Sequence, residues 1–332
     1  MIHRSRALAL ALGFVSVLGC GSVDPAEPPD SGPPIVGDGT PPTVVSIDPA
    51  DGASQVIDQP ITIHFSEPMA QATVQAAFAD ATFSWNGDGT EVAITTAFPF
   101  AETPKAYTVT LPTTVTDAHG TPLAAAVTST FALAALKTAT IGHQGSLIGN
   151  HAAPCAYGTF LQTGDMRSDH PTCPNAIIYG GISFALADLP AHDAILELRA
   201  ATVRTQVLKT AGEPGAAALG GLVVDHVTFA SGSAIATAEV HQQAFATWFA
   251  AGPIETGAAV SLDVTAQLER SWSDAVPSFQ LRVYPRGGSN RDAVTDLVYL
   301  RRGADENDGI VGEGVADPDA ANRLRLEVQY FQ

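Results

Sequence analysis

Short runs of alternating apolar and polar residues make up most of the chain after Thr43, and turns rich in glycine, proline and aspartate separate them. In residues 61–65, two isoleucines and a phenylalanine alternate with Thr62 and His64, which gives a strand one apolar face. The Asn-Gly-Asp-Gly sequence at 86–89 supplies the positive-φ residues of a tight hairpin. Turns spaced about ten residues apart predict an all-β chain of the sandwich type.

The same pattern divides the chain into two folded modules. We expect a first sandwich over residues 43–135, with strands near 43–47, 61–65, 82–85, 91–95, 106–111 and 127–133. We expect a larger, jelly-roll-like sandwich over residues 138–332, with strands near 177–186, 194–206, 221–229, 260–264, 278–284, 296–302 and 323–330. Two stretches, 241–250 and 265–272, fit a helical turn better than a strand.

The N-terminus has the layout of an export signal. Arg4 and Arg6 precede an uncharged apolar stretch at 7–18, which is too short to span a bilayer. The stretch ends at Cys20, in a sequence that resembles a bacterial lipobox. We therefore expect a signal peptide over 1–19, a lipid on Cys20 and a Pro/Gly-rich tether over 20–42. The expected location is the cell envelope, at the outer membrane or cell surface, or the exterior if Cys20 carries no lipid.

Acidic residues dominate the charge balance, with 34 Asp and Glu against 16 Lys and Arg and a formal net charge of −18. This balance excludes a nucleic-acid partner, which would need clustered cations, and it leaves the lipid as the only expected membrane contact. The sequence contains no G-x-S-x-G, H-E-x-x-H or P-loop motif. We therefore predict that the protein is not an enzyme; the alternative, a polysaccharide hydrolase, would need two carboxylates converging in a cleft.

Apart from Cys20, the chain has two cysteines, Cys155 and Cys173. An exported protein meets an oxidising compartment, so we predict that this pair closes a disulfide. The alternative is a metal site that combines the two cysteines with His151 or His170, but the spacing lacks a C-x-x-C knuckle.

Four segments of the first module resemble the bacterial immunoglobulin-like (Ig-like) domain of SbsA-like S-layer proteins. They are Pro-Pro-Thr-Val-Val-Ser-Ile-Asp-Pro-Ala-Asp-Gly-Ala at 41–53, Ile-Thr-Ile-His-Phe-Ser-Glu-Pro-Met at 61–69, Tyr-Thr-Val-Thr-Leu at 107–111 and Val-Thr-Asp-Ala-His-Gly-Thr-Pro-Leu at 115–123. The resemblance implies an immunoglobulin-like fold and a role as a spacer or interaction module. Glu67 lies in the shared turn, so we interpret it as structural.

The second module resembles the DNRLRE-type, disaggregatase-related jelly-roll modules, which often bind carbohydrate. The matching segments are 157–165, 181–190 with 194–198, 262–265 with Trp272, and the closing strand 323–330. The resemblance implies a binding face for polysaccharide. The alternative is a structural or protein-interaction component of the envelope, with an envelope protein as partner and no small ligand.

Arginine and tyrosine residues on the last expected strands suggest where such a face lies. If these strands are neighbours, a ladder of guanidinium groups beside tyrosine rings could receive carboxylated sugars. The candidate ligand-binding residues are Arg282, Tyr284, Tyr299, Arg301, Arg323 and Arg325. The alternative is an ordinary wet sheet face whose arginines pair with acids such as Glu327 and Asp296.

Aromatic and acidic residues elsewhere receive simpler interpretations. We expect Trp85, Trp248 and Trp272 to belong to the cores, with a sugar platform as the alternative. The acidic run at 305–309 fails the EF-hand pattern, so we predict no cofactor; the alternative is a looser calcium site there.

Overall fold

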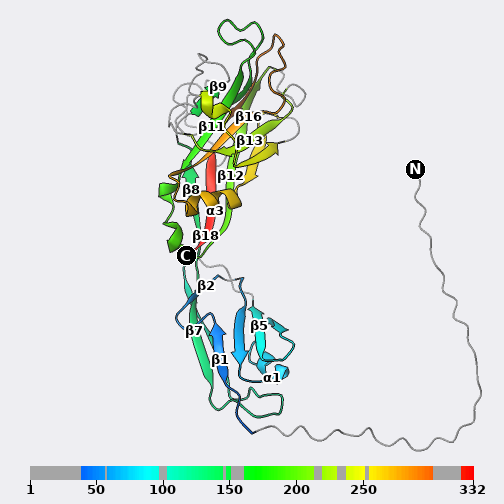
Figure 1. The fold of residues 1–332 in the computed structure, drawn as a ribbon, viewed down its shortest axis with the longest axis vertical. Coiled ribbons are helices and arrows are strands. Elements are labelled where there is room, and N and C mark those ends of the chain that lie inside the picture. Colours follow the sequence, from blue (N-terminus) through cyan, green and yellow to red (C-terminus); the bar gives the residue numbers. More distant parts are fainter. Residues whose placement is uncertain are drawn as a thin grey trace, which may run out of the picture.

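Two β-rich modules lie end to end along the long axis of the molecule (Figure 1). The computed structural model describes residues 39–56, 58–96, 103–144, 147–150, 161–212, 219–229, 237–250, 254–301 and 323–332. The C-terminus lies at the junction of the two modules (Figure 1). Among the described helices, none is long and apolar enough to cross a bilayer.

The first module is a sandwich of a four-stranded and a three-stranded sheet. The larger sheet has the order β1 (Val44–Asp48), β3 (Ile61–Phe65), β5 (Glu91–Thr96) and β4 (Ala81–Trp85). The smaller has the order β2 (Ser54–Gln55), β7 (Val127–Leu133) and β6 (Lys105–Leu111). A short helix, α1 (Gln71–Gln75), follows β3. The apolar face predicted for β3 is confirmed. Ile61, Ile63 and Phe65 are buried, whereas Thr62 and His64 are not.

The second module is one curled sheet of eleven strands. Its main path runs β14 (Ala246–Ala250), β13 (Leu222–Val227), β16 (Ser278–Pro285), β11 (Ile177–Ala185), β10 (Gln162–Asp165), β17 (Asp296–Leu300), β12 (Glu197–Ala211), β18 (Arg325–Phe331) and β8 (Leu136–Gly142). Off this path, β15 (Ala259–Asp263) pairs with β12, and β9 (Leu147–Asn150) pairs with β11. The described part of the chain is thus all-β in class.

The long strand β12 is where the sheet curls. Its first part pairs with β18 and β15, whereas its last part, from Val207 to Ala211, pairs with β17. The register shifts between Val207 and Lys209, a bulge that bends a strand and increases its twist. The curled sheet encloses a core that includes Phe184, Val203, Phe279 and Leu326.

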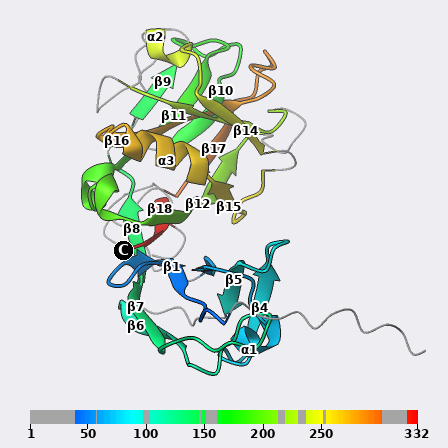
Figure 2. The ribbon, with the colours of Figure 1, turned by 60° about the horizontal axis from the view of Figure 1, so that its bottom comes forward.

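Helices are few and short in this module. The sequence prediction at 265–272 is confirmed by α3 (Thr265–Ser273), which buries Leu268 and Trp272 in the core and lies across the sandwich (Figure 2). The other helices are α2 (Thr237–Val240) and two short 3-10 turns, η1 (Leu186–Asp188) and η2 (His192–Ala194).

The helical prediction at 241–250 is wrong, because α2 ends at Val240, residues 241–245 form a turn and residues 246–250 form β14, which pairs with β13. Exposure alternates with a period of two from Phe245 to Phe249, which is the pattern of a strand.

The last strand joins the two modules. Phe331, at the end of β18, is fully buried and packs in the core of the first module, with Leu136 against the same core. The backbones of Ala135 and Gln332 exchange two hydrogen bonds, of 2.9 and 3.0 Å. An ion pair between Arg199 and Asp58 adds a second contact. The junction is therefore a packed interface.

Truncation of Phe331 should weaken this interface. We expect Phe331→Ala to lower the free energy of unfolding by about 3–5 kcal/mol, because the change leaves a cavity under a fully buried aromatic ring. Urea unfolding followed by tryptophan fluorescence measures the change. The control Val45→Ala alters a side chain that is 67% exposed and should stay within about 0.5 kcal/mol of the parent. Equal effects of the two variants would contradict the packing described.

Candidate ligand-binding surface

The structure separates the six residues that the sequence suggests as a ligand ladder. Strands β11 and β10 lie between β16, which carries Arg282 and Tyr284, and β17, which carries Tyr299. Strand β12 in turn lies between β17 and β18, which carries Arg325. The condition for the ladder, that these strands are neighbours, is not met, because the curled path inserts earlier strands between the later ones.

Arg282 is buried, with 4% of its surface exposed, and its guanidinium group pairs with the carboxylate of Asp225 on β13. It also donates hydrogen bonds to the carbonyl oxygens of Glu239 (3.0 Å), Val240 (2.7 Å) and Gln242 (3.3 and 3.2 Å). These contacts fasten the segment around α2 onto the sheet. The expectation that Arg282 lies on a wet face is therefore wrong, because α2 and the turn after it cover that side.

The two tyrosines are half-buried and packed. The ring of Tyr284 lies 5.2 Å from that of Tyr179 and 5.5 Å from the guanidinium carbon of Arg282. Lys209 places its ammonium nitrogen 4.5 Å from the centre of the Tyr299 ring. Burial raises the pKa of both phenols above the usual value. Both hydroxyl groups therefore stay protonated at neutral pH.

The remaining three arginines, Arg301, Arg323 and Arg325, lie near one another, where the start of β18 meets the end of β17. Glu327 accepts hydrogen bonds from Nε of Arg325 (2.7 Å) and Nε of Arg204 (2.6 Å). Burial acts to raise the pKa of Glu327, but these two arginines outweigh it and hold the pKa below its usual value. Arg301 and Arg323 are half-buried, and the amide of Leu324 donates to the Arg301 carbonyl at 2.8 Å. The pairing with acids that the alternative interpretation predicts is thus present at Arg325.

The three tryptophans have different environments. Trp272 is 5% exposed, and its indole nitrogen donates to the carbonyl oxygen of Pro190 at 3.0 Å. Trp85 packs against the first core and stacks on Phe65, with ring centres 6.4 Å apart. Both are core residues, as the sequence suggests. Trp248 is half-buried, packs against the second core and also lines a cleft.

That cleft, of about 280 Å³, opens between β14 and β15. These strands are edges of the curled sheet, since β14 ends the main path and β15 pairs only with β12. Most of the lining is aliphatic, with Trp248 and Phe249 on one side and Val260, Ser261 and Leu262 on the other. A larger hollow of about 530 Å³ beside α3 is shallower and has no aromatic residue among its lining.

Two exposed aromatic rings lie at β14: that of Phe249 in the strand, and that of Phe245 just before it, 5.2 Å from the ring of His226. Phe245 is 59% exposed and Phe249 is 61% exposed, with Thr247 between them also exposed. The guanidinium carbon of Arg270 lies 6.0 Å from the centre of the Phe245 ring, and that of Arg286 lies 5.2 Å from the Phe249 ring. We call Phe245, Thr247, Phe249, Arg270 and Arg286 the β14 strip. Figure 2 shows β14 near the edge of the sandwich.

The sequence analysis missed this strip because it assigned 241–250 to a helical turn. The signal that could have found it is the alternation of aromatic and small residues from Phe245 to Ala250. The two arginines come from α3 and from the turn after β16, so only the fold brings them to the rings.

A buried histidine lies next to this surface. His226 on β13 is 6% exposed, with its Nε2 atom 3.2 Å from the Ser271 hydroxyl and its ring 4.7 Å from that of Phe279. Burial, with a smaller contribution from the charge of Arg270, lowers the pKa of His226 to about 4. The ring is therefore neutral at physiological pH, and it packs as a core residue.

Two carboxylates converge in the second module, but they do so inside the sheet. Asp165 on β10 lies opposite Asp296 on β17, and both are fully buried. Asn290 donates its backbone N–H to Asp165 (3.0 Å) and its side-chain amide to Asp296 (3.2 Å). Burial raises the pKa of Asp165, and the charges of Asp296 and Asp292 add to the rise. Neither Asp165 nor Asp296 is among the residues that line the β14 cleft.

Within the described ranges, a single group of histidine and acidic side chains converges closely enough to hold a metal ion. It consists of Glu67, Asp117 and His119, in the first module.

Several residues singled out by the sequence lie outside the described part of the chain. They are Cys20, Cys155, His151 and the acidic run at 305–309. Cys173 is described and buried. The lipid on Cys20, the disulfide between Cys155 and Cys173, and calcium at 305–309 stay predictions.

The Arg282–Asp225 pair gives a direct test of its structural role. We expect Arg282→Met to lower the free energy of unfolding by about 3–5 kcal/mol, because the change leaves the Asp225 carboxylate buried without its cation. The double variant Arg282→Met/Asp225→Leu should recover much of that loss. Thermal and urea unfolding provide the values.

The matched control is Arg167→Met, which breaks the exposed ion pair between Arg167 and Asp169. An exposed pair contributes about 0–1 kcal/mol, so this variant should stay close to the parent. A loss at Arg282 no larger than that of the control would show that the buried pair is not structural.

Stability should also depend on pH through His226. The unfolded chain takes up a proton near pH 6.5 and the folded chain only near pH 4, so stability is full above pH 6.5 and falls as the pH drops toward 4. At pH 5 the loss from this residue is about 2 kcal/mol, from 1.36 kcal/mol per pH unit. His226→Gln should reduce the difference between urea unfolding at pH 7 and pH 5 by that amount. An unchanged difference would rule out the buried neutral ring.

Comparison with known proteins assigns the first module. Residues 38–132 match the family of the bacterial Ig-like domain. No curated protein matches the chain. Among solved structures, a similar one is SGBP-B of the Bacteroides ovatus mixed-linkage glucan utilization locus, in complex with a mixed-linkage heptasaccharide.

That structure is 11% identical with a TM-score of 0.18, and the match covers 75% of this chain and 50% of the other. The chain thus spans about half the length of SGBP-B, and a likeness this low carries no argument about fold or ligand. The family match and the two-sheet topology agree that the first module is a bacterial Ig-like domain.

Proposed function

We propose that this protein is a cell-surface binding protein whose second module holds a polysaccharide chain along the β14 strip, with the Ig-like module as spacer. The observation that carries the proposal is that Phe245, just before the edge strand β14, and Phe249, within it, are both exposed, and each has a guanidinium group over its ring. Ring faces can stack on the apolar faces of sugars, and guanidinium groups can donate to hydroxyl or carboxylate oxygens.

The geometry of the edge supports an extended ligand. Residues 245 and 249 are four positions apart, which in a strand is about 13 Å. A chain of several sugars can therefore contact both rings at once. The adjoining cleft between β14 and β15, lined by Trp248, offers a place for one end of such a chain.

The packed junction supports the spacer role. Phe331 buries its ring in the Ig-like core, so the two modules share packing through a strand of the second. A lipid on Cys20 and a tether over 20–42 would place this pair of modules at the membrane, as the sequence predicts. We also propose that the protein binds its ligand without chemical conversion.

Titration of the full-length protein with neutral and uronate-containing polysaccharides tests the proposal. We expect Phe249→Ala and Phe245→Ala each to weaken binding at least tenfold, a change of about 1.4 kcal/mol. Arg286→Ala should weaken binding of the uronate polymer more than that of the neutral one, because it removes a charge-assisted contact.

The matched control is Leu196→Ala, at a side chain in the same module that is 49% exposed and lines the shallow hollow beside α3. This variant should bind as the parent does. If no polysaccharide binds, or if the control loses as much as the β14 variants, the structural or protein-interaction role becomes the better account.

A further inference from the structure

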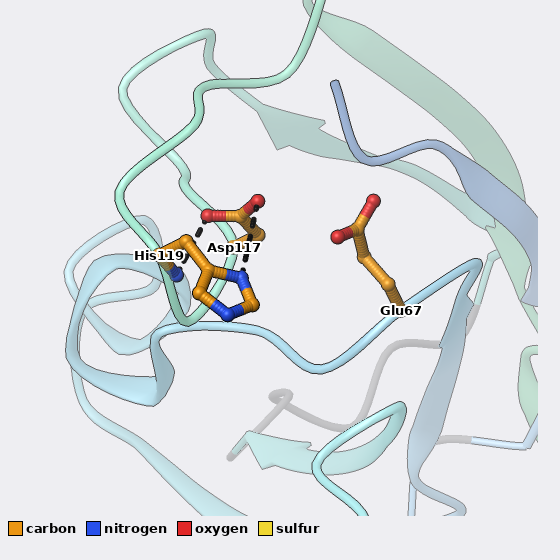
Figure 3. A group of neighbouring side chains, drawn as sticks. All are labelled: Glu67, Asp117 and His119. Carbon is orange, nitrogen blue, oxygen red and sulfur yellow. Dashed lines mark hydrogen bonds and ion pairs between the residues drawn. The ribbon is translucent and has the colours of Figure 1, made fainter. Parts of the chain in front are cut away.

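Two loops at the end of the Ig-like module away from the junction bring three metal-binding side chains together (Figures 1 and 3). Glu67 lies in the turn after β3, and Asp117 and His119 lie in the loop between β6 and β7. The amide of Ala70 donates to the Thr116 carbonyl at 3.0 Å, and that of Ala118 donates to the Pro68 carbonyl at 2.9 Å. The backbone thus holds the two loops in a fixed relation.

Asp117 is 1% exposed, and its two carboxylate oxygens have different surroundings. Its Oδ1 atom accepts the backbone N–H groups of His119 (2.8 Å) and Thr121 (2.7 Å). Its Oδ2 atom is buried and has no hydrogen-bond partner among the described residues. Figure 3 shows the Asp117 carboxylate beside the His119 ring, with the Glu67 carboxylate to one side of both. A buried oxygen without a donor is costly, and a cation at this position would remove the cost.

The two backbone N–H groups occupy Oδ1 of the Asp117 carboxylate, so its Oδ2 atom is the one that could contact a cation. A second carboxylate, that of Glu67, lies close by, so negative charge is concentrated at this point.

We propose that Glu67, Asp117 and His119 bind a divalent transition-metal ion of the zinc type. Their ligand atoms all lie within 4.8 Å of one another, and Nδ1 of His119 is 4.0 Å from Oδ2 of Asp117. Zinc bonds to nitrogen and oxygen are about 2.0–2.2 Å long and tetrahedral, so ligand atoms on one ion are about 3.3–3.6 Å apart. A small inward rotation of the Glu67 and His119 side chains would bring the three ligand atoms within bonding distance of one ion. Water would complete the coordination of that ion.

The donor set selects among ions. Imidazole nitrogen suits zinc and its neighbours, whereas calcium takes six to eight oxygen ligands. A bound ion would tie the turn after β3 to the β6–β7 loop, beside the place where Thr43 and Ser66 exchange hydrogen bonds of 3.0 Å. It would therefore stabilise the end of the module at which the chain enters from residue 39.

Calorimetric titration of chelator-treated full-length protein with Zn²⁺, and separately with Ca²⁺, tests the site. We expect one Zn²⁺ per chain at this site and a rise in the melting temperature on binding. His119→Ala and Glu67→Gln should each weaken this binding at least tenfold and abolish most of the rise in melting temperature. Both side chains lie at or near the surface, so both variants should fold.

The matched control is the double variant His64→Ala/Glu91→Gln. It removes a histidine and a glutamate of the same module that lie 3.5 Å apart on the surface of the sheet. This variant should bind Zn²⁺ as the parent does. The proposal is overturned if Zn²⁺ does not bind, if His119→Ala and Glu67→Gln bind it as tightly as the control, or if Ca²⁺ binds more tightly than Zn²⁺.

Discussion

The second module depends on a single strand, β12, that belongs to both layers of its sandwich. Its first ten residues pair with β18 and β15, and its last residues cross over to pair with β17. Without this bend the eleven-stranded sheet could not fold back on itself to enclose a core. The curl also leaves β14 and β15 as edges, and the cleft opens between them. The candidate site thus lies where it does because β12 takes part in both layers of the sandwich.

The arginines of the second module have two kinds of surroundings: some pair with carboxylates of the sheet, and two at the β14 edge lie over aromatic rings. Arg282 and Asp225 neutralise one another beneath α2, and Glu327 lies between Arg325 and Arg204. Arg270 and Arg286 differ from these residues because their guanidinium groups lie over exposed rings. An arginine stacked on a ring keeps hydrogen-bond donors at its rim available for an incoming acceptor. Arg282, which is buried and paired with a carboxylate, therefore differs from the two candidate binding arginines, which are exposed.

Much of the fold could be predicted from the sequence, because alternation along a strand is a local property. Strands β3 and β7 begin and end where their apolar pattern does, and α3 lies where the strand rhythm breaks. The site could not be predicted in the same way. A period of two shows that Arg282 and Tyr284 share a face, but not that α2 covers it, and it gives no strand order. The helical prediction over 241–250 was made in place of the strand β14. That strand forms by pairing with β13, which is distant in the sequence, and a local pattern does not determine such a pairing. The group of Glu67, Asp117 and His119 forms only because two distant loops meet.

The central claim is that the β14 strip is the surface that receives the ligand. Hydrogen–deuterium exchange of the full-length protein, with and without saturating polysaccharide, tests it most directly. The account predicts that amides of the β14 edge and of the turn after β16, which carries Arg286, become slower to exchange, while β12 and β18 stay unchanged. Protection confined to the β18 face around Arg325, or to the Ig-like module, would contradict it.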